Sequence, residues 1–103
     1  MTSVSKKVNY KKKNLQIIPL NVPSTDSITE IDFSYNPITS FENLPYIENL
    51  TKLIIDSTKI STFHYAPCLP NLESFSCRNT PLGSSSHIGL MSAIVFGDKL
   101  KQV

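Results

Sequence analysis

Glycine is scarce in this chain of 103 residues, which contains only three. A glycine-rich phosphate-binding loop needs several glycines in a short segment, so nucleotide sites of that kind are excluded. The sequence also lacks an apolar run of about 18 residues, and we expect no membrane-spanning helix. Only two cysteines are present, Cys68 and Cys77, and no apolar stretch of the signal-peptide type follows the N-terminal lysines. We therefore expect an intracellular protein with two free thiols, a disulfide being the less favoured alternative.

Acidic residues are absent from residues 1–25, whereas the remainder of the chain carries all eight of them. The formal net charge of +2 therefore divides into a basic N-terminal part and a slightly acidic remainder. We predict that residues 1–14 form a flexible basic arm. Such an arm either stays a solvated tail or anchors the protein to an acidic surface, such as RNA or the acidic tubulin lattice. Its lysines are Lys6, Lys7, Lys11, Lys12 and Lys13.

An internal repeat runs through the middle of the chain, because residues 28–49 align in phase with residues 50–71 and with a partial copy at 72–83. Each unit begins with the alternation of a β-strand and continues with an apolar spacing of three, typical of a helical or 3₁₀-like return. A unit of this size cannot bury its apolar stripe alone, so we expect the units to stack. The predicted core residues are Ile28, Ile31, Phe33, Ile38, Phe41, Leu44, Ile47, Leu50, Leu53, Ile55, Ile60, Phe63, Ala66, Leu69, Leu72, Phe75, Cys77 and Leu82.

The segment ITEIDFSYNPI, residues 28–38, resembles the leucine-rich repeat, whose consensus is LxxLxLxxNxL. The repeat length is similar to that of the subclass found in the regulatory subunit of protein phosphatase 1, the spliceosomal A-prime protein and the leucine-rich light chain of axonemal dynein. The resemblance implies an α/β leucine-rich repeat solenoid, with a short curved parallel sheet of about four strands, an irregular or 3₁₀ convex side and a C-terminal cap helix. The alternative is an ordinary α/β domain with accidental periodicity.

Two further segments flank the repeats, which span residues 28–83. Residues 15–27 are apolar but out of phase with the repeat, and we expect them to form an N-terminal cap with a degenerate edge strand and a turn. Residues 84–103 are similar to the C-terminal cap of this subclass, in which a helix precedes a short extended return. In this cap we expect Ser85 or Ser86 to cap the helix, Ile88, Met91, Ile94 and Val95 to form its apolar side, Gly97 to end it, and Leu100 and Val103 to pack onto the last repeat.

Asn36 occupies the repeat position at which the chain turns away from the strand. In the family that this repeat resembles, the asparagine side chain hydrogen-bonds the backbone of the bend, and stacked copies form a ladder. The equivalent residues in the next two units are Thr58 and Thr80, which offer a single hydroxyl each. We therefore expect a partial ladder, in which Asn36 makes the fullest set of hydrogen bonds.

Strand residues between the core positions are expected to face the concave, solvent-exposed side of the sheet. Stacking in register would place Glu30 beside Lys52 and Asp56 beside Arg78. Such pairs are either ordinary surface ion pairs or contacts to a partner. The predicted partner-binding residues on this face are Glu30, Asp32, Tyr35, Lys52, Ile54, Asp56, Ser76 and Arg78.

Ile54 is the apolar exception in this polar array, and we expect Tyr35 to lie diagonally beside it. Scattered apolar residues on a protein surface are normal. An aliphatic and an aromatic side chain at the centre of a concave sheet are also what a binding hot spot contains. Ile54 and Tyr35 are therefore the central residues of the predicted binding face.

Residues that could support catalysis or metal binding do not form a recognisable group. His64 and His87 are far apart, on the convex return and in the first turn of the predicted helix. Cys77 occupies a core position, and Cys68 lies four residues from His64 with nothing to orient the pair. We therefore expect no enzymatic activity, no cofactor and no metal.

The sequence as a whole favours a non-catalytic protein–protein interaction module or scaffold subunit of a larger intracellular assembly, either cytoskeletal or axonemal, or similar to a phosphatase regulator. The alternative is a ribonucleoprotein subunit similar to the spliceosomal A-prime protein, binding an RNA-binding partner. We expect at least one protein partner and neither a membrane nor a small-molecule substrate, and the lysines are candidates for contact with an acidic surface of tubulin or RNA. The expected location is the cytoplasm, including the cytoskeleton or axoneme, with the nucleus as the alternative. Because this scaffold serves many unrelated partners, the partner itself is not identified.

Overall fold

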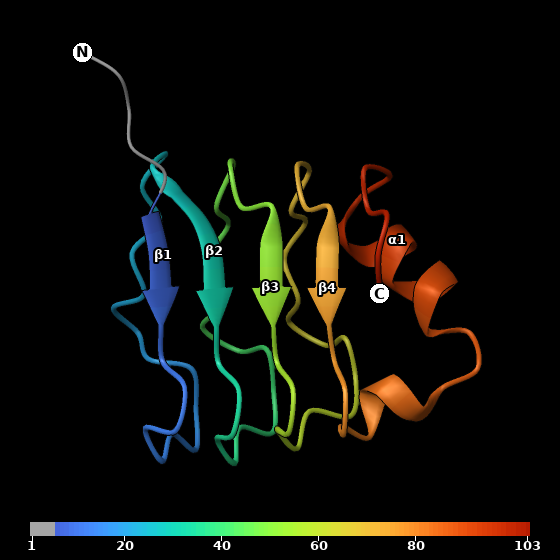
Figure 1. Cartoon of the computed structure of the whole chain (residues 1–103), viewed down its shortest axis with the longest axis horizontal. Helices are drawn as coiled ribbons and strands as arrows, with labels where there is room; N and C mark the ends of the chain where they lie inside the picture. The colour runs from blue at the N-terminus through green and yellow to red at the C-terminus, as the bar shows by residue number, and fades with distance from the viewer. Residues whose placement is uncertain (1–5) are drawn as a thin grey trace.

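A four-stranded parallel sheet and one C-terminal helix form the described part of the chain, residues 6–103 of a computed structural model (Figure 1). The strands are β1 (Lys6–Asn9), β2 (Ile28–Asp32), β3 (Lys52–Ile54) and β4 (Ser74–Ser76), and they lie in chain order across the sheet. A short 3₁₀ helix η1 (Leu82–Ser84) and the helix α1 (Ile88–Phe96) follow. The expected α/β class with a short parallel sheet and a C-terminal helix is therefore confirmed.

The register of the sheet follows the sequence repeat. Ile31 pairs with Leu53, and Leu53 pairs with Phe75, so that residues 22 apart in the sequence lie side by side. The bends after the strands repeat as well, since Tyr35, Ser57 and Asn79 all adopt the left-handed backbone conformation, with φ between 55° and 59°. Equivalent positions of successive units therefore have equivalent backbone geometry.

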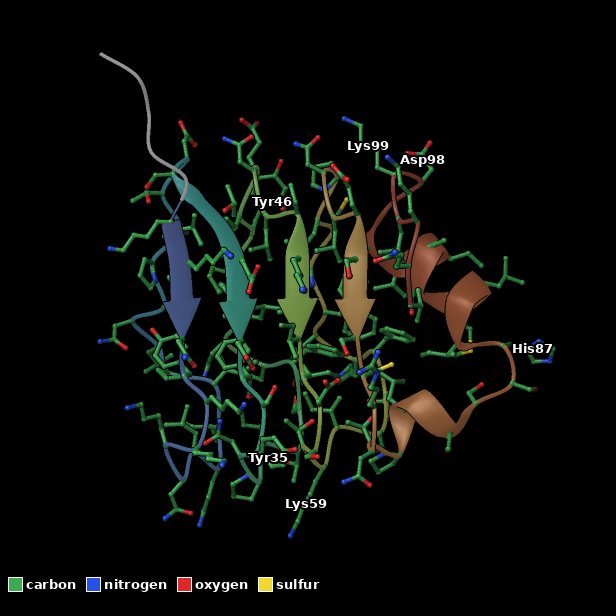
Figure 2. All side chains as sticks on the ribbon, in the orientation of Figure 1. Tyr35, Tyr46, Lys59, His87, Asp98 and Lys99 are labelled. Carbon is green, nitrogen blue, oxygen red and sulfur yellow. The ribbon has the colours of Figure 1, made fainter. Side chains whose placement is uncertain are left out.

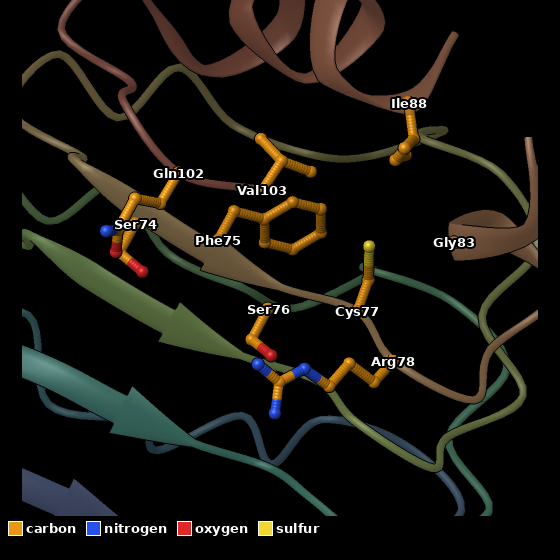
Figure 3. Close-up of a pocket in the computed structure, with 9 residues that line it drawn as sticks. All are labelled: Ser74, Phe75, Ser76, Cys77, Arg78, Gly83, Ile88, Gln102 and Val103. Atoms are coloured by element: carbon orange, nitrogen blue, oxygen red, sulfur yellow. The ribbon is translucent and has the colours of Figure 1, made fainter. Parts of the chain in front are cut away.

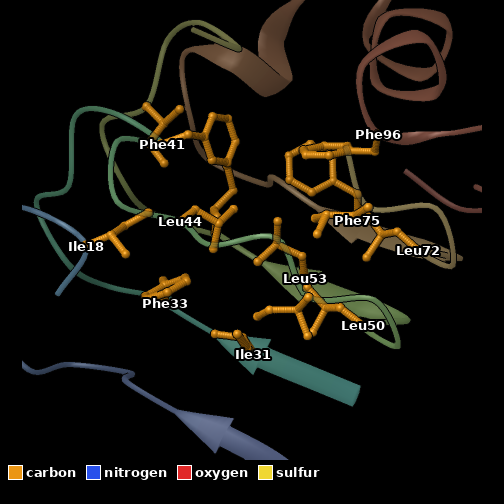
Figure 4. Packing of buried hydrophobic residues seen from close by; sticks show 14 of the residues in the cluster. Ile18, Ile31, Phe33, Phe41, Leu44, Leu50, Leu53, Leu72, Phe75 and Phe96 are labelled. Carbon is orange, nitrogen blue, oxygen red and sulfur yellow. The ribbon is translucent and has the colours of Figure 1, made fainter. Parts of the chain in front are cut away.

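The apolar core lies behind the sheet, between the strands and the return segments (Figure 4). All of the predicted core residues are buried except Phe63 and Ala66, which are half-buried and pack against the core. The helix α1 joins this core through Phe96, whose ring centroid lies 4.9 Å from that of Phe75 and 6.0 Å from that of Phe41. An aromatic cluster thus attaches the C-terminal helix to the end of the stacked units.

The first strand is formed by residues that we predicted to be a flexible arm, and that prediction is wrong for residues 6–14. Lys6–Asn9 form β1, and the ring of Tyr10 stacks on Phe33 with centroids 5.3 Å apart. Residues 15–27 are the return segment of this first unit, with Ile18 and Val22 buried, and contain no edge strand. Residues 1–5 of the predicted arm lie outside the described residues.

The 22-residue alignment does not include the N-terminal unit, because its strand precedes the equivalent strand of the next unit by 23 residues. Val8 pairs with Ile31 in the sheet, and the apolar residues 10, 15 and 18 keep that offset, but Val22 precedes its equivalent, Leu44, by 22 residues. One extra residue therefore lies between Ile18 and Val22. Leu20, in this insertion, is 85% exposed.

The C-terminal cap agrees with prediction in part. Gly97 ends α1 with φ 145°, and residue Gln102 forms a parallel bridge with Ser74, which covers part of the outer edge of β4. The N-cap residue of α1 is His87 rather than Ser85 or Ser86, and its side chain makes no capping hydrogen bond. The Oγ atom of Ser85 accepts the backbone N–H of His87 at 3.2 Å. Leu100 is half-buried against the core, as predicted, whereas Val103 is 48% exposed.

The buried side of α1 also differs from the predicted one. Ser92 and Phe96 are buried, Ile88 and Val95 are half-buried, and Met91 and Ile94 are exposed, with Ile94 at 74%. The helix meets the core through its C-terminal aromatic residue, and this contact fixes which side faces inward. No helix in residues 6–103 is both long and apolar enough to cross a membrane.

Asn36 makes the fullest set of bonds in the bend, as predicted. Its Nδ2 atom donates to the carbonyl oxygens of Tyr10, Phe33 and Ser34, and its Oδ1 atom accepts the N–H groups of Lys13 and Leu15. Thr58 donates only to Ile55, and Thr80 donates to Cys77 and accepts from Gly83. Asn36 therefore links the N-terminal unit to the rest of the fold.

Candidate functional site

The exposed face of the sheet carries five of the eight predicted binding residues in register. Glu30, Lys52 and Ser74 form one row across β2, β3 and β4, and Asp32, Ile54 and Ser76 form the next. The structure adds β1 to this face, because Lys7 pairs with Glu30 and Asn9 with Asp32. These two residues were not expected on the sheet, and the signal that could have placed them is the 23-residue offset of their unit.

Ile54 is the one apolar residue on the exposed face of the four described strands, and it is half-buried. It lies between Asp32 and Ser76 in its row. An aliphatic side chain held on a rigid strand and surrounded by polar groups can bury its remaining surface only against another molecule. Its position fits the hydrophobic centre and polar rim of a protein interface.

Tyr35 lies beside Asp56 rather than in the row of Ile54, because its backbone N–H donates to the carbonyl oxygen of Asp56 at 3.0 Å. The residue sits beyond the carboxyl end of β2, in the bend, with φ 59° and 54% of its surface exposed (Figure 2). Its ring has two lysine neighbours, the Nζ atoms of Lys11 and Lys12, at 5.4 and 5.3 Å from the ring centroid. Tyr35 therefore belongs to a basic cluster at one end of the sheet rather than to an apolar centre.

The predicted side-by-side charges use other partners. Glu30 forms its ion pair with Lys7 at 3.9 Å, not with Lys52, and this surface pair, with Lys7 exposed and Glu30 half-buried, contributes about 1 kcal/mol. The Oδ1 atom of Asp56 accepts the Ser76 hydroxyl at 2.6 Å and the backbone N–H of Arg78 at 2.8 Å. Asp56 is thus held by β4 and the bend after it, and among residues 6–103 the guanidinium group of Arg78 forms no ion pair.

A shallow hollow of about 420 Å³ lies beside β4, the last strand of the sheet (Figure 3). The Arg78 side chain extends toward Ser76 at one side of it, and Gln102 and Val103 form the opposite side. The predicted binding residues Ser76 and Arg78 therefore line the same hollow, at the edge of the exposed face.

The lysines of the N-terminal unit lie at ordered positions. Lys6 and Lys7 are on β1, and Lys11, Lys12 and Lys13 follow in the bend. Of these five lysines, only Lys7 forms an ion pair within residues 6–103. The exposed face is therefore strongly basic at the edge formed by β1 and polar at the edge formed by β4.

The thiols and imidazoles do not form a reactive group. Cys77 is buried, and burial, followed by the charge of Asp56, raises the pKa of its thiol from 9.0 to about 11. Cys68 is exposed and its Sγ atom donates to the carbonyl oxygen of Phe96 at 3.5 Å. His64 packs against Tyr65, with ring centroids 4.1 Å apart. Cys77 consequently remains a neutral thiol at neutral pH, which makes it a poor nucleophile.

Metal ligands do not cluster in the part of the chain that the structure describes, where no group of three or more His, Cys, Asp or Glu side chains could hold an ion. No protein-family model, curated protein or solved structure matches the chain. The site is therefore interpreted from its own geometry.

Proposed function

We propose that this chain is a small leucine-rich repeat solenoid that works as a non-catalytic protein-interaction module, binding its partner through the exposed face of the sheet. The observation that carries this proposal is Ile54, an apolar side chain in register with Asp32 and Ser76 on a rigid parallel sheet. Apolar anchors that are surrounded by polar residues supply much of the binding free energy of protein interfaces.

The small size of the face bears on the kind of partner. A stable interface buries about 800 Å² on each side, and strands of three to five residues provide little of this area alone. The partner would have to extend over the basic N-terminal end or the hollow beside β4 as well. We therefore propose a subunit of a larger assembly, with the cytoskeleton or axoneme as its setting, rather than a free-standing receptor.

Affinity purification from cells with tagged protein tests this proposal. The wild-type protein is compared with Ile54→Asp and with Ile94→Asp, which makes the same substitution on the exposed side of α1. We expect Ile54→Asp to lose the co-purifying proteins while Ile94→Asp retains them. Normal recovery with Ile54→Asp, or loss with Ile94→Asp alone, would refute the sheet face as the binding surface.

A ribonucleoprotein subunit is the second candidate function, and the basic cluster favours it. Lys11 and Lys12 lie over the ring of Tyr35, with Lys13 next to them, so positive charge and an exposed aromatic ring occur together. RNA binding through lysines weakens steeply with salt, because each phosphate contact releases counterions. Binding of this kind should be lost in the triple variant Lys11→Ala, Lys12→Ala, Lys13→Ala and unaffected by Ile54→Asp, the reverse of the first proposal.

A further inference from the structure

The outer edge of β1 is the open edge of the sheet in the described structure (Figure 1). Backbone groups along a strand point alternately to its two sides. Tyr10 donates its N–H to Asp32 of the β2 segment at 2.8 Å, so Val8 and Tyr10 face β2. The backbone groups of Lys7 and Asn9 therefore point away from the sheet, where they could pair with an added strand. The opposite edge is different, because Phe75 already donates its N–H to Gln102.

The side chains of β1 define what an added strand would need. Lys7 and Asn9 lie on the exposed face, together with Lys11 after the strand, whereas Val8 and Tyr10 are half-buried at the open end of the core. An added strand in register would place alternate side chains beside the lysines and the intervening ones beside Val8 and Tyr10. Acidic and apolar residues in alternation would match both sides.

The molecule already contains one example of this pairing. On its inner side, β1 binds the sequence Glu30-Ile31-Asp32-Phe33, in which acidic and apolar residues alternate. Glu30 pairs with Lys7 at 3.9 Å, Ile31 lies beside Val8, and Phe33 stacks on Tyr10. The outer side of β1 presents the same side chains, so the same pattern would complement it.

A second copy of this chain is a poor occupant of the same edge. Pairing two β1 strands would bring Lys6 and Lys7 of one molecule close to those of the other, and like charges across a strand pair destabilise it. Lysines on edge strands act in general against edge-to-edge association. They do not oppose a strand that carries carboxylates, and they favour its approach.

We propose that the open edge of β1 binds an extended segment of a partner protein, in which acidic and apolar residues alternate, as a fifth parallel strand. Main-chain hydrogen bonds to Lys7 and Asn9 would supply affinity, and the alternation of side chains would supply specificity. Lys7 and Asn9 also border the exposed face, but Ile54 lies two strands away from this edge, so either proposal can fail without the other.

A peptide with the β2 sequence ITEIDFSY provides a direct test with the intact protein. Binding is measured by fluorescence anisotropy, and backbone NMR shifts locate the contact, which we expect over residues 6–12. In the proposed geometry, the N–H groups of the apolar residues of the peptide point toward β1, as those of Val8 and Tyr10 point toward β2. N-methylation of the peptide at its second isoleucine and phenylalanine should weaken binding at least about tenfold, since two hydrogen bonds are lost. N-methylation at the glutamate and aspartate should change binding less than about twofold, because those groups point to solvent.

Charge variants complete the test. The protein variant Lys7→Glu, Lys11→Glu should lose binding and instead accept a peptide in which both acidic residues are lysine, while Lys59→Glu should bind as the wild type does. Three results would overturn the proposal: no binding up to about 1 mM peptide, equal effects of both methylation patterns, or NMR shifts centred on Ile54. Equal effects of both methylation patterns would indicate that charge alone attracts the acidic peptide. Shifts centred on Ile54 would support only the proposed sheet face.

Discussion

Replacing Asn36 by alanine removes the side chain that links the N-terminal unit to the rest of the molecule. Asn36 lies in the bend after β2 and is 1% exposed. Three of its five hydrogen bonds reach back to Tyr10, Lys13 and Leu15, more than 20 residues earlier in the chain. The other two hold the bend itself, at the carbonyl oxygens of Phe33 and Ser34.

The cost of the substitution follows from what each group retains. The N–H groups of Lys13 and Leu15 lose their acceptor, at about 1 kcal/mol each because both are only partly buried. The carbonyl oxygen of Ser34 still accepts the N–H of Lys12 at 3.1 Å, so its loss is smaller. With the carbonyl oxygens of Tyr10 and Phe33 included, we expect Asn36→Ala to lower the free energy of unfolding by about 3 kcal/mol.

The threonines of the later bends provide an internal scale for this estimate. Thr58 makes one hydrogen bond, to Ile55 at 2.9 Å, and Thr80 makes two, to Cys77 at 2.6 Å and from Gly83 at 2.9 Å. We expect alanine at Thr58 to cost about 1 kcal/mol and alanine at Thr80 slightly more. Asn36→Thr supplies a hydroxyl that donates to Phe33, as Thr58 donates to Ile55, and removes the links to the first unit. Its cost should therefore fall between those of Asn36→Ala and Thr58→Ala.

Urea unfolding and amide hydrogen exchange measure the two consequences separately. In a domain of this length, 1 kcal/mol corresponds to roughly 4–8 °C in Tm, so Asn36→Ala should lower Tm by more than about 10 °C. The amides of Lys13 and Leu15 should lose protection before those of β3 and β4. A destabilisation no larger than that of Thr58→Ala, or uniform loss of protection, would refute the role assigned to Asn36.

Two further substitutions test the packing at the C-terminal end. A Cβ atom on Gly83 would clash with the carbonyl oxygen of Cys77, so Gly83→Ala should lower the free energy of unfolding in urea by about 1–3 kcal/mol. At Gly89 in α1, an added Cβ atom would meet no atom within 4 Å outside the helix's own backbone, so Gly89→Ala should raise the free energy of unfolding by up to about 1 kcal/mol. A Gly83→Ala variant with unchanged stability would contradict the close contact with Cys77. Because burial raises the pKa of the Cys77 thiol from 9.0 to about 11, the stability that its neutral form provides is complete below pH 9 and is lost as the pH rises to about 11. The difference in unfolding free energy between the wild type and Cys77→Ala should therefore shrink over this range, and iodoacetamide at pH 8 should modify Cys68 well before Cys77.

The core and the rows of the exposed face could be predicted from spacing alone. Residues that recur every 22 positions must meet in a parallel stack, so the burial of Ile31, Leu53 and Phe75 in one row follows from their sequence positions. The alternation along each strand then places Ile54 on the opposite face. Both inferences depend only on periodicity, which a single sequence contains.

The bend and the C-terminal helix could not be derived in the same way. The residue directly before Asn36, and its equivalent in each of the other units, is left-handed. These residues are Lys12, Tyr35, Ser57 and Asn79, which share no residue preference that would indicate the turn. The helix α1 is apolar at most positions, so helical spacing cannot select its buried side. That choice depends on Phe96 reaching Phe75, a contact between residues 21 apart with no periodic relation.

The N-terminal unit was missed for a different reason, because its residues follow the repeat and only their offset differs. One inserted residue between Ile18 and Val22 shifts β1 and its bend out of the 22-residue alignment, although Val8 and Tyr10 occupy core positions in the sheet. A loop absorbs an extra residue at the cost of about a few tenths of a kcal/mol, whereas a strand cannot slip by one residue without turning its apolar side outward. Phase within a unit is therefore more strongly constrained than the distance between units. A search that allows the unit length to vary by one residue would have recovered β1, and with it the open edge that we propose as a binding site.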